Sequence, residues 1–171
     1  LVALQLDAIG ASAADIGRVL MTYFIAIALL GPLAPRLYER RLPASLVGFC
    51  GALLSAISLA VAATWPAYWA ILFAVFGAGV GHALVRVPQV SMAMEISESR
   101  LRHIGTNAVL GSLRTLERAG SIVALVVLSL LASAMGYPFT IGVVSAWVFI
   151  GALVFAAAYF RRDQRRTSNI I

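Results

Sequence analysis

The sequence contains no lysine, a single cysteine and few charged residues of either sign. Of its 171 residues, 12% are charged and 61% are hydrophobic, whereas a soluble domain carries roughly 25% charged residues. So few charged residues cannot cover the surface of a water-soluble protein. The composition therefore favours a membrane protein over a soluble protein with a large apolar core. The lone Cys50 excludes an intramolecular disulfide and a cysteine-based metal site. His82 and His103 lie far apart, and no metal-ligand spacing surrounds them.

All 13 basic residues are arginines, and the formal net charge is +6. A nucleic-acid-binding protein would arrange such charge as a basic stripe with interleaved aromatic residues. Here the arginines lie between apolar runs and at their ends. They therefore indicate membrane topology: the expected partner is a lipid bilayer, and no nucleic acid is expected.

Five apolar runs are long enough to cross a bilayer, which takes about 20 helical residues. All are rich in small residues, which let membrane helices approach closely. We therefore expect an all-α membrane protein with helices at about 16–37, 44–63, 67–93, 106–134 and 139–160, followed by a basic tail at 161–171. The opening LVALQLDAIG is expected to be the end of a sixth helix whose beginning is missing. Ser12 or Asp15 is expected to cap the helix that follows.

The connections between these runs alternate in charge. PRLYERRLP, SESRLRHIGTN and the final RRDQRR contain arginine, whereas ATWPAY and SAMGYPFT contain no charged residue. Short arginine-rich loops stay in the cytoplasm. Aromatic residues gather at membrane–water interfaces, and Trp65, Tyr68, Trp69 and Tyr137 lie in or beside the uncharged connections. These aromatics are therefore expected at the membrane surface opposite the cytoplasm. The sequence thus predicts an integral protein of a bacterial cytoplasmic (inner) membrane with a cytoplasmic C-terminus.

The segment GPLAPRLYERR, at residues 31–41, resembles the signature loop of the major facilitator superfamily. In that family the loop follows the second helix and recurs in weaker form after the eighth. Its pattern is Gly, any residue, Leu, Ala, Asp, Arg, any residue, Gly and then basic residues. The matching residues here are Gly31, Leu33, Ala34, Arg36, Arg40 and Arg41. Pro35 replaces the acidic residue and Tyr38 the second glycine, which suits the weaker copy. The preceding LDAIGASAADIGRVL also looks like the outer turn between the seventh and eighth helices.

This resemblance covers essentially the whole chain. It implies that residues 1–160 form the C-terminal half of such a transporter, from the end of the seventh helix through the twelfth. It also implies secondary active transport of a small solute by alternating access, in which two six-helix halves rock around a midplane site. The missing N-terminal six-helix half and an unknown small-molecule substrate would then be partners. In the family the ninth and twelfth helices are peripheral, which agrees with the absence of ionisable residues from the middles of 44–63 and 139–160.

Two of the runs contain ionisable residues. In GAGVGHALVRVPQ, the spacing i, i+4, i+7 places His82, Arg86 and Gln89 on one helix face, and Pro88 is expected to bend that helix. One interpretation is a polar face on the substrate pathway. The other is that Arg86 extends to the cytoplasmic interface while His82 bonds a neighbouring helix.

The next run begins SLRTLERAGS, where Arg114, Glu117 and Arg118 fall on one face. A buried charge needs a partner, and for Glu117 the candidates are Arg86, Arg114 and Arg118. We expect an Arg86–Glu117 pair that closes the cytoplasmic mouth. A charged helix start at the membrane interface is the alternative, which is favoured for Arg114.

Two other functions remain open from the sequence. The bundle could be a sensory or scaffold module coupled to a signalling domain, or the product of a truncated or degenerate gene. No nucleophile–base pair, phosphate-binding loop or metal signature occurs. The sequence therefore predicts neither an enzyme nor a cofactor.

Overall fold

Helices joined by short connections make up the part of the chain that the structure describes. The structure, a computed structural model, describes residues 1–33, 35–36, 43–100, 103 and 105–168. Its helices are α1 (Val2–Ala8), α2 (Ala13–Leu30), α4 (Ala44–Thr64), α5 (Tyr68–Arg100), α6 (Thr106–Met135) and α7 (Tyr137–Ser168). No strand occurs in these ranges, so the all-α fold expected from the sequence is confirmed.

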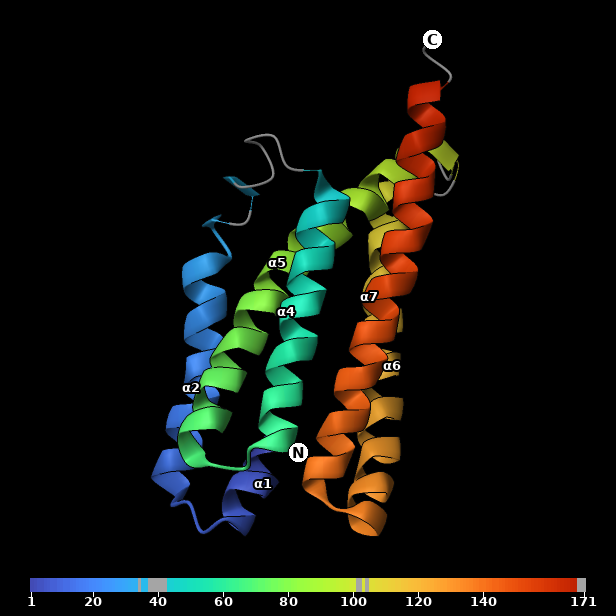
Figure 1. Cartoon of the computed structure of the whole chain (residues 1–171). Helices are drawn as coiled ribbons and strands as arrows, with labels where there is room; N and C mark the ends of the chain where they lie inside the picture. Colours follow the sequence, from blue (N-terminus) through green and yellow to red (C-terminus); the bar gives the residue numbers. More distant parts are fainter. Residues whose placement is uncertain (34, 37–42, 101–102, 104, 169–171) are drawn as a thin grey trace.

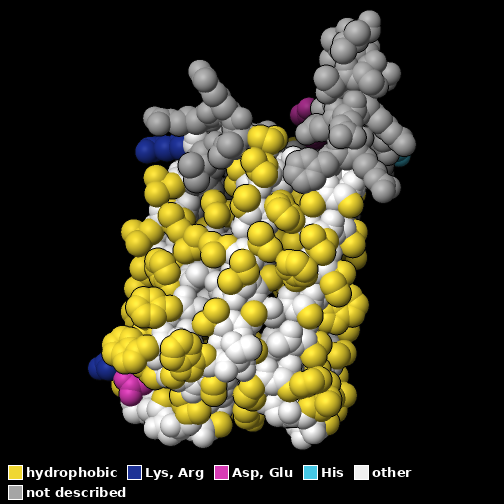
Figure 2. All heavy atoms as spheres, viewed as in Figure 1, with side chains coloured by type: hydrophobic (Ala, Val, Ile, Leu, Met, Phe, Trp, Pro, Cys, Tyr) yellow, Lys and Arg dark blue, Asp and Glu magenta, His cyan; other side chains and the backbone are white. Residues whose placement is uncertain are grey.

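Helices α2, α4, α5, α6 and α7 are each long and apolar enough to cross a membrane. They stand side by side in an elongated bundle (Figure 1). Large apolar side chains point outward along it: Phe73, Leu125 and Trp147 are 67%, 72% and 71% exposed. On the face that Figure 2 views, the charged side chains shown lie near the two ends and the band between them is apolar. An apolar surface of this extent suits lipid rather than water.

The two ends of the bundle differ in chemistry. The end of α2, the start of α4, the end of α5, the start of α6 and the end of α7 lie together (Figure 1). We call this the arginine-rich end, because the sequence next to these helix ends contains the arginines of residues 36–41, 100–102 and 161–166. At the opposite end, which we call the aromatic end, Trp65 and Trp69 are each 67% exposed, and the rings of Tyr68 and Trp69 meet edge to face at 5.3 Å.

Helix α2 ends earlier than the sequence suggested, at Leu30 rather than near Leu37. The Gly31 N–H donates to the Ile27 carbonyl oxygen at 2.7 Å and completes the last turn. Pro32 follows and has no N–H with which to continue the ladder. The proline therefore ends the span before the apolar pattern does.

The start of α2 is capped by Ser12, one of the two residues expected to do so. The Ser12 Oγ accepts a hydrogen bond from the Asp15 N–H at 3.2 Å and donates one to the Asp15 carboxylate at 2.6 Å. Arg18 contacts the other oxygen of that carboxylate at 2.8 Å. The first of these contacts satisfies one of the backbone donors that the first turn of a helix leaves free.

Two helices are longer than expected. Helix α5 continues to Arg100, beyond the expected limit near residue 93, and α7 runs to Ser168, into the segment expected to be a tail. Pro88 lies inside α5 and is fully buried. The upper part of α5 changes direction in Figure 1, as an internal proline predicts, because its ring displaces the carbonyl one turn earlier.

The tightest packing joins α4 to α5, and α4 also packs against α7. A side chain at Gly81 would collide with the Gly51 carbonyl oxygen and with Ser55. The two helices thus approach backbone to backbone, which only small residues permit. On the other side of α4, Ser145 of α7 donates to the Ala56 carbonyl oxygen at 2.7 Å.

Helix α1 is tied to the bundle by Gln5 and Leu6, both buried. The Gln5 side-chain amide donates to the Ala62 carbonyl oxygen of α4 at 3.1 Å. Leu6 packs with Val19 of α2 and Ile71 of α5. One turn of helix therefore joins three of the spans at the aromatic end.

Helix α6 is the least enclosed span. Ala132 is its one buried residue among those described. Leu116, Leu125 and Leu130 are 71%, 72% and 66% exposed. Its main contacts with the rest of the bundle are to α5 and α7, so α6 stands at an edge of the assembly.

Candidate functional site

The polar residues of α5 follow one another along one helix face. At 1.5 Å per residue, His82 lies about 21 Å and Arg86 about 27 Å along the axis from Tyr68. An apolar core about 30 Å thick that begins near Tyr68 would therefore enclose both residues in the half nearer the arginine-rich end. His82 and Arg86 are exposed in the bundle, and Gln89 is half-buried. Their side chains are available to a solute or to a partner element.

The link between α5 and α6 is made by Gln89 and Glu117. The Gln89 side-chain amide donates to Glu117 Oε1 at 2.8 Å. The other carboxylate oxygen, Oε2, accepts from Arg114 at 2.9 Å. Both carboxylate oxygens are thus engaged, one across the helix boundary and one within α6. A charge-assisted hydrogen bond is about twice as strong as a neutral one, which makes Glu117 the main polar contact holding α6 to α5.

The expected ion pair between Arg86 and Glu117 is not formed within the described ranges. Glu117 is instead paired with Arg114, and at the other end of the bundle Asp15 is paired with Arg18. Gln89, three residues beyond Arg86 on the same face, reaches Glu117 instead. Arg86 is left exposed, and Arg118 is exposed on α6. Glu117 of α6 is therefore bound to α5 through the Gln89 side-chain amide, and its counterion is Arg114 of the same helix.

Sequence reasoning missed Tyr23 of α2. The centroid of its ring lies 5.9 Å from that of the His82 ring and 5.5 Å from that of the Phe24 ring. Arg86 lies within electrostatic range of Tyr23 and His82, and Glu117 within range of His82. A tyrosine in the run VLMTYFIAIALL looks like any other apolar span residue. Its role appears only when α2 and α5 are brought together.

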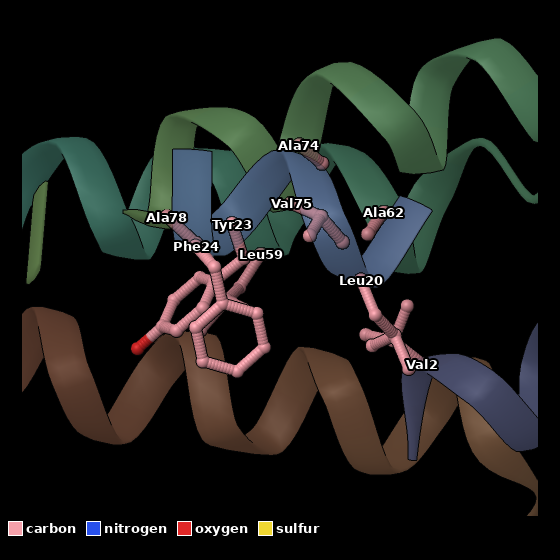
Figure 3. Close-up of a pocket in the computed structure, with 9 residues that line it drawn as sticks. All are labelled: Val2, Leu20, Tyr23, Phe24, Leu59, Ala62, Ala74, Val75 and Ala78. Atoms are coloured by element: carbon pink, nitrogen blue, oxygen red, sulfur yellow. The ribbon is translucent and has the colours of Figure 1, made fainter. Parts of the chain in front are cut away.

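A cavity of about 340 Å³ opens beside Tyr23. It is lined by side chains of α1, α2, α4 and α5, namely Val2, Leu20, Tyr23, Phe24, Leu59, Ala62, Ala74, Val75 and Ala78. Figure 3 shows Tyr23 and Phe24 extending from α2 in the same direction, with the Tyr23 hydroxyl oxygen at the Ala78 end, far from Val2. Ligand pockets in proteins have volumes of roughly 300–1,000 Å³, and this cavity falls at the small end of that range.

The signature-like loop is described only in part. Gly31 closes α2, Leu33 is 43% exposed and Arg36 lies just beyond it. Ala34, Arg40 and Arg41 lie outside the described residues. No cluster of three potential metal-ligating side chains occurs in the described part of the chain.

These features define a class of protein, namely a polytopic, helical integral membrane protein. Its otherwise apolar spans carry a polar row, formed by His82, Arg86 and Gln89 on α5 and by Arg114, Glu117 and Arg118 on α6. Residues 1–171 match the sequence model of the family described as Major Facilitator Superfamily. The chain belongs to that family, which consists of transporters and not of enzymes. No curated protein and no solved structure matched the chain. The family predicted from residues 31–41 is therefore confirmed.

Proposed function

We propose that the chain is the C-terminal half of a secondary active transporter that moves a small solute by alternating access. In this assignment α1 is the end of the seventh helix, and α2, α4, α5, α6 and α7 are the eighth to twelfth. The observation that carries the proposal is the family match over the whole chain. It is supported by the polar row of α5 and α6, because ionisable residues inside membrane spans mark solute or ion pathways. An N-terminal six-helix half would complete the site.

Alternating access has a direct test at Ala78. This residue lines the cavity, and it lies about 15 Å along α5 from Tyr68, half-way across a 30 Å apolar core. In the protein expressed from its complete gene, in a cysteine-free background that includes Cys50→Ala, Ala78→Cys should react with a membrane-impermeant maleimide from both sides. Right-side-out and inside-out vesicles would give the two rates. Val154→Cys, on the exposed outer surface of α7, is the control and should react from neither side.

Labelling of the thiol at position 78 from one side under every condition would contradict alternating access. It would favour the sensory or scaffold interpretation, since such a module needs no pathway through the membrane. Labelling from both sides supports transport whatever the solute is. The measurement can therefore be made before the substrate is identified.

We further propose that the arginine-rich end faces the cytoplasm of a bacterial cell, with the C-terminus on that side. The support is the alternation of loop charge in the sequence, together with the position at one end of the bundle of the helix ends that flank the arginine-containing segments. In the Cys50→Ala background, Asn107→Cys should be labelled only from inside and Pro66→Cys only from outside. Both positions are exposed and lie at opposite ends. Labelling of the Asn107→Cys variant from outside intact cells would show that the protein has the opposite orientation in the membrane.

A further inference from the structure

One face of α5 changes from apolar to cationic within a short distance. Val75 and Ala78 line the cavity, His82 follows one turn later and Arg86 a further turn on. Since successive positions are four residues apart, the step from Ala78 to Arg86 covers about 12 Å of helix axis. Tyr23 bridges the two regions, because its ring both lines the cavity and contacts His82. The cavity and Arg86 therefore form a single continuous face.

The charged group on this face of α5 is the Arg86 guanidinium, and the nearby carboxylate of Glu117 is held by other residues. Glu117 is already occupied by Arg114 and Gln89. Arg86 makes no ion pair with any carboxylate in the described part of the chain. A cation at membrane depth is costly without a partner, and such a residue by default marks a functional site whose partner remains to be identified.

We propose that this face binds an amphiphilic organic anion, with its apolar body in the cavity beside Tyr23 and its anionic group at Arg86. The inference rests on the proposed transport function and names its substrate class. The donors suit an anion: the Arg86 guanidinium offers a fork of N–H groups, and the imidazole of His82 and the hydroxyl of Tyr23 can each donate one hydrogen bond. The cavity walls are apolar and partly aromatic, which suits a ring or a short hydrocarbon chain.

The test is a charge-matched series of probes with one shared apolar body. Benzenesulfonate is an anion, benzenesulfonamide is neutral and phenyltrimethylammonium is a cation. Binding of each to the detergent-purified protein from the complete gene would be measured by titration calorimetry. We expect benzenesulfonate to bind at least tenfold more tightly than the other two. Arg86→Gln should remove about tenfold of that affinity while leaving benzenesulfonamide unchanged, because a hydrogen bond to a charged group is worth at least that factor. Arg86→Lys should retain part of the preference, since it keeps the charge and loses the fork.

Arg18→Gln is the matched control, because Arg18 is exposed, already paired with Asp15 and located at the aromatic end. It should leave all three affinities unchanged. Each variant would first be checked by its melting temperature, so that loss of folding is separated from loss of binding. If Arg86→Gln melted early, Arg86→Lys together with the probe series on the unmodified protein would still decide the question.

Equal affinity for the three probes would overturn the proposal, as would binding of none of them or an Arg86→Gln variant that binds benzenesulfonate normally. In the last case Arg86 simply extends to the membrane interface. Failure of this proposal is distinguishable from failure of transport. An Ala78→Cys protein labelled from both sides without anion preference would leave the transporter intact with another substrate class. Anion preference with one-sided labelling would indicate a binding module that does not transport.

Discussion

Replacing Gly81 with alanine is expected to lower the free energy of unfolding of the bundle by about 1–3 kcal/mol, the usual cost of overpacking a tight contact. The added Cβ would meet the Gly51 carbonyl oxygen and the Ser55 side chain, and would lie 2.9 Å from the Ser55 backbone nitrogen. Two of these atoms belong to the α4 backbone, which cannot turn aside as a flexible side chain can. The α4–α5 contact would have to open along its length.

The matched control is Gly111→Ala on α6, where a Cβ would have no atom within 4 Å. Alanine favours helix over glycine by up to about 1 kcal/mol, so this variant should be as stable as the parent or more so. Thermal unfolding of the detergent-purified protein, followed by intrinsic tryptophan fluorescence, would compare the two. An equal melting temperature for Gly81→Ala and the parent would show that α4 and α5 are not in backbone contact.

Replacing Glu117 with leucine is expected to shift the protein toward conformations open at the arginine-rich end. The change removes the hydrogen bond from Gln89 and the ion pair with Arg114. Only the Gln89 hydrogen bond crosses between helices, because the Arg114 ion pair lies within α6 and survives opening. The Glu117 side chain is 34% exposed, so solvent reduces the contribution of this hydrogen bond to roughly 1.4 kcal/mol. That free energy corresponds to about a tenfold change in the equilibrium between closed and open conformations.

The readout is the maleimide reactivity of position 78 from the arginine-rich side, in the Cys50→Ala, Ala78→Cys protein. It should rise by about that factor in Glu117→Leu. The matched variant Glu117→Gln keeps a side-chain oxygen that can accept from Gln89 and loses only the charge, so its reactivity should rise much less. Equal rises in the two variants would assign the effect to the Arg114 ion pair rather than to the link between helices. An unchanged reactivity in Glu117→Leu would show that Glu117 does not hold this end closed.

The spans were the predictable part of the fold. Apolar length and loop charge alone identify five membrane helices, because lipid allows few other structures for such runs. The helix ends were predicted less well where short-range chemistry competes with hydropathy. Gly31 and Pro32 end α2 inside the apolar pattern, whereas α5 continues as helix through the polar residues before Arg100.

The site was predictable as a set of residues and not as a set of contacts. The spacing of His82, Arg86 and Gln89 places all three on one face, and the sequence could go no further. Which of them meets Glu117 depends on how far α6 is displaced along α5, and one helical turn separates Arg86 from Gln89. Tyr23 could not be selected from its neighbours, because its contact with His82 depends on how α2 is rotated about its axis.

The exposed position of α6 has a consequence for biosynthesis. This helix contains Arg114, Glu117 and Arg118 in its first half. Insertion of a helix by the translocon costs about 2.5–3.5 kcal/mol for each ionised side chain near the centre of the span. The ion pair within α6 reduces that penalty before any neighbour is present, and Gln89 reduces it further only after α5 has entered the bilayer. Membrane insertion of α6 therefore depends on the order of synthesis. Helix α5 leaves the ribosome first, so the Gln89 side-chain amide is already in the bilayer when α6 enters it.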